Sequence, residues 1–137
     1  MERFLDKKYK LKTSDCFEEY MKFLGIGFVS RMSAASVTPV ITLSRNDNDS
    51  YSLTTQTSLK NTQITFKPGE EFVEERPDGV KVNSIITFDG NNLIHLQTDA
   101  DKRTSTQVRS YTDTLMTAIT TANGWSGKCV RTYEYIP

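Results

Sequence analysis

The sequence predicts an all-β fold, a meander of short antiparallel strands that closes into a barrel or a sandwich. Three observations predict it. Runs of alternating polar and apolar residues recur after Pro39, spaced by about ten residues. Turn sequences such as Lys67-Pro68-Gly69 and Pro77-Asp78-Gly79 separate these runs. Helical periodicity is confined to one short region before Pro39.

The N-terminal part supplies one strand and two short helices. An opening strand is expected around Lys8–Lys12. Ser14 or Asp15 is expected to cap a helix whose apolar residues have helical spacing, at Phe17, Met21 and Leu24. Gly25 and Gly27 end this helix, and a second begins near Phe28. It must stop before Pro39, because proline disfavours helical backbone at the preceding residue.

The later strands carry many polar residues on both faces. Threonines occupy positions that a dry core would give to valine or leucine, for example Thr54, Thr55, Thr57, Thr117, Thr120 and Thr121. Polar groups on both faces suggest a barrel with a wet cavity. Solvent exposure of one face explains the same composition, and periodicity does not choose between the two interpretations.

Composition excludes several classes of protein. A chain of 137 residues without a linker fits one domain spanning 1–137. Its 17 basic residues balance 17 acidic ones, so nucleic acid is not an expected partner. His95 is the only histidine, which excludes a multi-histidine zinc site, and no apolar run reaches the length of a membrane span. Without an N-terminal signal pattern, the two cysteines are expected to be reduced thiols in a cytoplasmic protein.

No catalytic motif supports an enzyme. The chain contains no Gly-x-Ser-x-Gly elbow, no phosphate-binding loop and no cysteine–histidine pair with supporting spacing. His95 occupies an ordinary strand position. The acidic pairs Glu70-Glu71 and Glu74-Glu75 are interpreted as solvated hairpin edges. We therefore expect a non-catalytic protein without a cofactor or a metal.

The chain resembles the intracellular lipid-binding proteins, which include fatty-acid-binding proteins and their retinoid-binding relatives. The similarity is collinear over nearly the whole chain. It is carried by Lys8–Leu11, Phe17–Lys22, Leu24–Gly27, Leu59–Thr62, Phe66–Phe72, Asp78–Val82, Gln107–Arg109 and Cys129–Tyr133. The resemblance implies a ten-stranded antiparallel up-and-down barrel of lipocalin-like type, with a helix-turn-helix lid. It also implies a monomer that carries one long-chain fatty acid in a water-filled cavity and makes transient contact with membranes or acceptor proteins.

The resemblance assigns a carboxylate clamp to Arg109, Arg131 and Tyr133. Arg131 and Tyr133 are two residues apart, so in a strand their side chains leave on one face. If that face points inward, the guanidinium can pair with a carboxylate and the phenol can donate a hydrogen bond to it.

Further ligand contacts follow from the family pattern. On the lid side they are Phe17, Met21, Ser30, Ala34 and Pro39, and on the barrel wall Leu59, Asp78 and Gln97. Leu59 stands where many relatives carry a phenylalanine gate. Core packing explains Phe17 and Met21 equally well, and Asp78 is also an ordinary turn residue.

Two alternatives to a fatty-acid carrier remain open. Retinoic acid also presents a carboxylate, so the same three residues fit a retinoid carrier, whereas retinol would leave two buried guanidinium groups without an anion. The other alternative is an interaction module in which the lipid only fills the interior.

Overall fold

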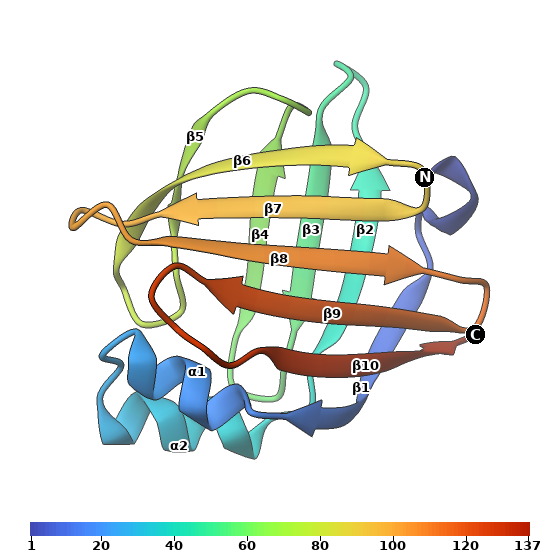
Figure 1. Cartoon of the computed structure of the whole chain (residues 1–137). Coiled ribbons are helices and arrows are strands. Elements are labelled where there is room, and N and C mark those ends of the chain that lie inside the picture. The colour runs from blue at the N-terminus through green and yellow to red at the C-terminus, as the bar shows by residue number, and fades with distance from the viewer.

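Ten strands form one antiparallel sheet in the computed structural model, which describes residues 1–137. The strands are β1 (Lys8–Asp15), β2 (Val40–Arg45), β3 (Tyr51–Gln56), β4 (Asn61–Phe66), β5 (Phe72–Glu75), β6 (Lys81–Asp89), β7 (Asn92–Thr98), β8 (Thr104–Tyr111), β9 (Leu115–Ala122) and β10 (Cys129–Ile136). Helices α1 (Phe17–Phe23) and α2 (Phe28–Ser36) connect β1 to β2. The predicted ten-stranded barrel with a helical lid is confirmed (Figure 1).

The barrel is almost closed by strand pairing. Consecutive strands pair from β1 to β4 and from β5 to β10, and β1 also pairs with β10. The two edges of the sheet are β4 and β5, which do not pair with each other. A gap in the hydrogen-bonded wall therefore lies between these two strands.

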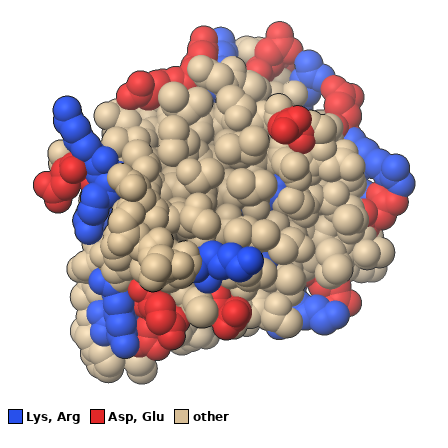
Figure 2. All heavy atoms as spheres, in the orientation of Figure 1, with Lys and Arg blue, Asp and Glu red and all other residues tan.

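Alternation along each strand separates an inner from an outer face. In β7, Leu93, His95 and Gln97 are buried, whereas Leu96 between them is exposed. Figure 2 shows the outer face of β6 to β10, where charged side chains lie mainly toward the edges. The polar side chains of the inner face, such as His95 and Gln97, are thus on the opposite side of the barrel wall from the surface charges.

The end of the barrel opposite the helices is filled by an apolar core. A 3-10 turn, Glu2–Phe4, places the Phe4 ring 5.5 Å from the Tyr111 ring, and Tyr9 meets Tyr111 edge-on at the same centroid distance. The Tyr9 hydroxyl donates to the carbonyl of Thr112 at 2.9 Å. The side chains of this end are therefore packed against one another, and the gap in the wall lies between β4 and β5.

The first helix begins differently from the sequence-based expectation. Neither Ser14 nor Asp15 caps it, because β1 continues through Asp15 and pairs there with Val130. Cys16 is the N-cap residue, with a left-handed φ of 62° and no side-chain cap hydrogen bond. The expected end of the helix is confirmed, since α1 stops at Phe23 and Gly25 has a φ of 79°.

Helix α1 is fixed to β10 and to the last hairpin. Tyr20 and Leu24 bury their side chains against Cys129, at the start of β10. Trp125, in the turn before β10, lies 5.5 Å from the Tyr20 ring and 6.1 Å from the Phe23 ring. Cys129 is a free thiol, as is the exposed Cys16. None of the helices has the length and hydropathy to cross a membrane.

Candidate functional site

Two arginines lie on either side of Ala118 on the inner face. Arg131 of β10 pairs with Ala118 of β9, which pairs in turn with Arg109 of β8. Residues directly opposite each other in an antiparallel sheet project to the same side, so both guanidinium groups share one face. The Nε atom of each arginine is buried without a hydrogen-bond partner. Two half-buried cations, each with a buried donor that is unused, form a site suited to an anion.

Arg131 is held between the lid and its own strand. Its guanidinium carbon lies 4.0 Å from the centroid of the Phe17 ring and 5.9 Å from that of the Tyr133 ring. A cation over an aromatic face is stabilised without using its hydrogen-bond donors. The Arg131 donors thus stay free for a ligand, while the aromatic rings fix the position of the group.

Arg109 is joined to a polar network on the neighbouring strands. Its Nη2 donates to Gln107 Oε1 at 2.9 Å, and its Nη1 lies 3.5 Å from His95 Nδ1. The Gln107 amide donates to Gln97 Oε1 at 3.3 Å. The two arginines therefore differ: Arg109 has partners within the protein, and Arg131 has aromatic neighbours.

Glu74 is the acidic end of this network. Its Oε1 accepts from Ser84 Oγ at 2.8 Å, from His95 Nε2 at 2.8 Å and from Gln97 Nε2 at 3.1 Å. Burial opposes its ionisation, but these hydrogen bonds outweigh burial and hold the pKa of Glu74 below its ordinary value. Burial lowers the pKa of His95, with a further contribution from Arg109. The pair is therefore a carboxylate and a neutral imidazole at pH 7.

Sequence reasoning missed Glu74. Its interpretation as part of a solvated acidic edge is wrong, because its side chain is only 10% exposed, whereas Glu75 points outward. The available signal was alternation: Phe72 and Glu74 are two residues apart in one short strand, so they share the inner face. His95 likewise proves to be a contact of both Glu74 and Arg109.

The other residues expected to contact a ligand lie in several parts of the fold. Phe17 and Met21 belong to α1, where Met21 is buried, and Pro39 is buried just before β2. On α2, Ser30 is exposed and Ala34 half-buried, and Leu59 in the β3–β4 turn is 66% exposed. Gln97 is buried within the polar network. Asp78 lies in the β5–β6 turn, where its carboxylate accepts two hydrogen bonds from Arg76, at 3.1 and 2.9 Å.

Only some of these residues are brought close to the two arginines. Phe17 contacts Arg131 directly, and Gln97 is linked to Arg109 through Gln107. Leu59 and Ser30 instead lie on exposed segments of the turn and the helix. The expected set therefore includes residues at the anion site, exposed residues near the lid, and residues such as Met21, Pro39 and Asp78 that are covered elsewhere.

A cavity of about 400 Å³ opens at the gap between β4 and β5. Its walls include Gln63 and Ile64 from β4 and Phe72 and Glu74 from β5. The cavity is bounded mainly by polar side chains, and Glu74 connects it to the network that ends at Arg109. The unpaired edges thus leave an open groove in the barrel wall, which Glu74 borders.

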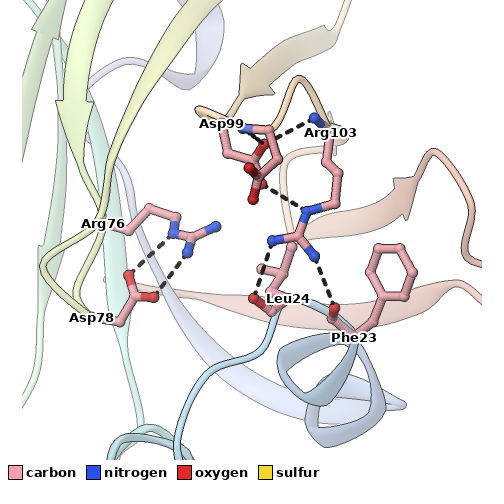
Figure 3. A network of polar contacts seen from close by, with 7 residues as sticks. Phe23, Leu24, Arg76, Asp78, Asp99 and Arg103 are labelled. Atoms are coloured by element: carbon pink, nitrogen blue, oxygen red, sulfur yellow. Dashed lines mark hydrogen bonds and ion pairs between the residues drawn. The ribbon is translucent and has the colours of Figure 1, made fainter.

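A second cluster of charged residues fastens the lid, as Figure 3 shows. Arg103, in the β7–β8 turn, donates from Nε to Asp99 Oδ2 at 2.9 Å. Its Nη1 and Nη2 reach the carbonyl oxygens of Phe23 and Leu24 at 3.4 and 3.5 Å. These carbonyls belong to the C-terminal end of α1, where a cation offsets the negative end of the helix dipole.

Comparisons with known proteins identify the family of this chain. Residues 7–134 match the model of the lipocalin / cytosolic fatty-acid binding protein family. A muscle fatty acid-binding protein of Schistocerca gregaria is 49% identical over 98 residues, covering 71% of this chain and 73% of the relative.

Solved structures extend the similarity to the whole fold. The crystal structure of a fatty acid-binding protein from brain tissue of Drosophila melanogaster has a TM-score of 0.88 at 43% identity, covering 96% of this chain and 98% of the other. A Schistosoma mansoni fatty acid binding protein in complex with arachidonic acid has a TM-score of 0.91 at 31% identity, covering 100% and 98%. The chain belongs to the lipocalin / cytosolic fatty-acid binding protein family, whose members are non-catalytic binding proteins.

Proposed function

We propose that this protein carries one long-chain fatty acid inside the barrel, with the carboxylate held by Arg109, Arg131 and Tyr133. The observation that supports it most directly is the pair of arginines beside Ala118, each with a buried Nε that lacks a partner. A carboxylate supplies the charge and the acceptors that these groups need. Tyr133 lies two residues from Arg131, on the same inward face of β10.

The hydrocarbon chain supplies most of the affinity in this proposal. Burial of each methylene contributes about 0.8 kcal/mol, so a long chain gains on the order of 10 kcal/mol before the costs of association and ordering. The threonine, serine and glutamine side chains of the inner wall tolerate ordered water around a bent chain. A related Schistosoma mansoni protein has been solved with arachidonic acid, a fatty acid of this class.

We infer that the protein is a cytoplasmic monomer and that the ligand enters and leaves the barrel near the lid. Phe28, Val29 and Met32 of α2 and Leu59 of the neighbouring turn expose large apolar side chains. Ala34 and Ser30 lie on the same helix, and Met21 and Pro39 lie beneath the lid. These surfaces fit transient contact with a membrane or an acceptor protein during transfer of the ligand.

The main test is the variant Arg131→Leu, titrated calorimetrically with oleate. We expect the dissociation constant to rise well beyond tenfold, because breaking a buried charge pair costs about 3–5 kcal/mol. Arg45→Leu, which removes an exposed arginine at the far end of β2, is the matched control and should bind as the parent does. An unchanged constant in Arg131→Leu would mean that the headgroup lies elsewhere.

A second measurement separates fatty acids from retinoic acid. A retinoid is rigid and needs a fitted apolar opening, whereas Ser30, Ala34, Leu59 and Asp78 offer its ring small or polar contacts. We expect oleate or palmitate to bind at least tenfold more tightly than all-trans retinoic acid, about 1.4 kcal/mol. Displacement of a fluorescent fatty acid by each competitor gives the ratio. If retinoic acid displaced the probe more strongly, the proposal of a fatty-acid ligand would be wrong, but the proposed clamp would still stand.

A further inference from the structure

The inner wall contains a negative charge that a fatty-acid site does not require. The Glu74 carboxylate is nearly buried and accepts hydrogen bonds from Ser84, His95 and Gln97 through a single oxygen, Oε1. A carboxylate in such a position repels any other anion brought into the same space, and low solvent exposure weakens the screening of that repulsion.

Few charges contribute to the field inside the barrel. Arg109 and Arg131 are positive, and Glu74 is negative. The Arg76–Asp78 pair near the lid offsets its own charge, since both side chains are 12% exposed and joined by two hydrogen bonds. Arg31 of the lid is paired with Glu18 at 3.9 Å. With a neutral His95, the remaining groups therefore leave one net positive charge, enough to balance one carboxylate.

The contacts connect Glu74 to Arg109 and not to Arg131. His95 lies between them, with Nε2 at 2.8 Å from Glu74 and Nδ1 at 3.5 Å from Arg109. Gln97 and Gln107 form a second link between the same two residues. Glu74 thus offsets the charge of Arg109, while Arg131 keeps its charge for the ligand.

We propose that Glu74 is a specificity-determining residue that restricts the site to lipids with one negative charge. This specificity proposal rests on the proposed function, because it assumes that an anionic headgroup binds beside Arg109 and Arg131. Long-chain monocarboxylates satisfy the charge balance. A lipid of the same chain length with a dianionic headgroup brings a second negative charge that Glu74 repels and no free cation offsets.

The test compares hexadecanoate with tetradecylmalonate, which is hexadecanoate with a second carboxylate on C2, at about pH 8, where both headgroups are ionised. The quantity measured is the ratio of their dissociation constants, obtained by displacement of one fluorescent fatty acid. In Glu74→Gln we expect the preference for hexadecanoate to fall by about tenfold or more. The reason is that the second carboxylate of the dianionic lipid is no longer repelled by the charge of Glu74. Affinity for hexadecanoate itself should rise by a smaller factor.

Two control variants separate interior charge from other effects. Glu75→Gln removes the same charge from the next residue, which faces solvent, and should leave the ratio unchanged. Glu74→Asp keeps the charge but shortens the side chain, and should also keep the ratio within about threefold. A double variant, Glu74→Gln with Arg109→Gln, restores the net interior charge and should return the ratio toward that of the parent.

The proposal is overturned if Glu74→Gln binds both lipids with the preference of the parent, or if Glu75→Gln changes the ratio equally. It is also overturned if Glu74→Asp loses the preference, since Glu74 would then act only through its hydrogen bonds. Should Glu74→Gln fail to fold, Glu74→Ser, which removes the same charge, is measured in its place and should show the same fall in preference. Failure of the proposed function would be seen separately, as an unchanged dissociation constant for hexadecanoate in Arg131→Leu.

Discussion

The guanidinium carbon of Arg131 lies 4.0 Å from the centroid of the Phe17 ring, so the first residue of α1 touches a cation of the proposed clamp. Arg131 belongs to the last strand, and Phe17 belongs to the lid. A movement of α1 away from the barrel therefore removes a contact of Arg131. This relationship couples the position of the lid to the electrostatics of the anion site.

The first prediction tests that coupling with Phe17→Leu. Leucine keeps an apolar side chain but loses the aromatic face, a contribution of about 1–2 kcal/mol for a partly desolvated cation. We expect the dissociation constant for oleate to rise about five- to thirtyfold in calorimetric titration. Phe23→Leu is the matched control, because Phe23 lies against Trp125. Equal weakening in both variants would show that only packing of α1 matters.

The second prediction concerns the fastening of α1 by Arg103. The variant Arg103→Ala removes the donors to the carbonyls of Phe23 and Leu24 and the pair with Asp99. Because this arginine is partly exposed, we expect a loss of only about 1 kcal/mol. Dissociation of a fluorescent fatty acid, followed by stopped flow, should accelerate about fivefold while the barrel stays folded. Lys102→Ala, in the same turn but exposed, should have the parent's rate.

Much of the fold could be predicted from the sequence because its determinants are local. Alternation and turn residues predict strands, and Gly25 with its positive φ marks the end of α1. The start of α1 could not be predicted in this way. Ser14 and Asp15 are good capping residues, yet pairing with Arg131 and Val130 of β10 keeps both in β1. A long-range contact therefore overrides the local capping preference.

The anion site depends on register, which the sequence does not reveal directly. That Arg109 and Arg131 face each other across Ala118 follows from the pairing of β8, β9 and β10. Family resemblance predicted the two arginines as a pair, whereas alternation alone gave only the shared face of Arg131 and Tyr133. Glu74 was missed because an acidic run usually marks a solvated edge, and only its contact with His95 reveals the buried position.

The third prediction concerns Trp125, the only tryptophan of the chain. Its ring packs against Tyr20 and Phe23, so the last hairpin supports the lid. Trp125→Ala should lower the free energy of unfolding by about 1–3 kcal/mol, since aromatic pairs contribute about 0.5–1.5 kcal/mol each. Urea unfolding followed by circular dichroism measures the loss. Trp125→Phe should recover at least half of it; an unaltered midpoint in the alanine variant would contradict a supporting role.

The fourth prediction is a dependence of stability on pH that originates from His95. Burial and the Arg109 guanidinium lower the pKa of His95 in the folded protein, although the hydrogen bond to Glu74 opposes them. The unfolded chain keeps a pKa near the ordinary value of 6.5. As the pH falls below that value, the unfolded state takes up a proton that the folded state refuses. The free energy of unfolding must therefore decrease as the pH falls.

Glu74 adds to the same trend only at lower pH. Its pKa is lowered from an ordinary value of 4.5, so its contribution is present above that pH and is lost below it. Between about pH 7.5 and 5.5 the decrease therefore belongs to the histidine, and it cannot exceed about 1.4 kcal/mol, the limit for an imidazole that stays neutral in the folded protein.

Urea unfolding at several pH values measures this change, and His95→Gln is the variant that isolates it. Glutamine keeps a polar side chain beside Glu74 and does not titrate. Because the chain has no other histidine, the unfolding free energy of His95→Gln should be nearly constant across this interval. If the variant loses as much stability as the parent between pH 7.5 and 5.5, the proton is taken up elsewhere. The buried imidazole would then not be the neutral partner that the interior charge balance requires.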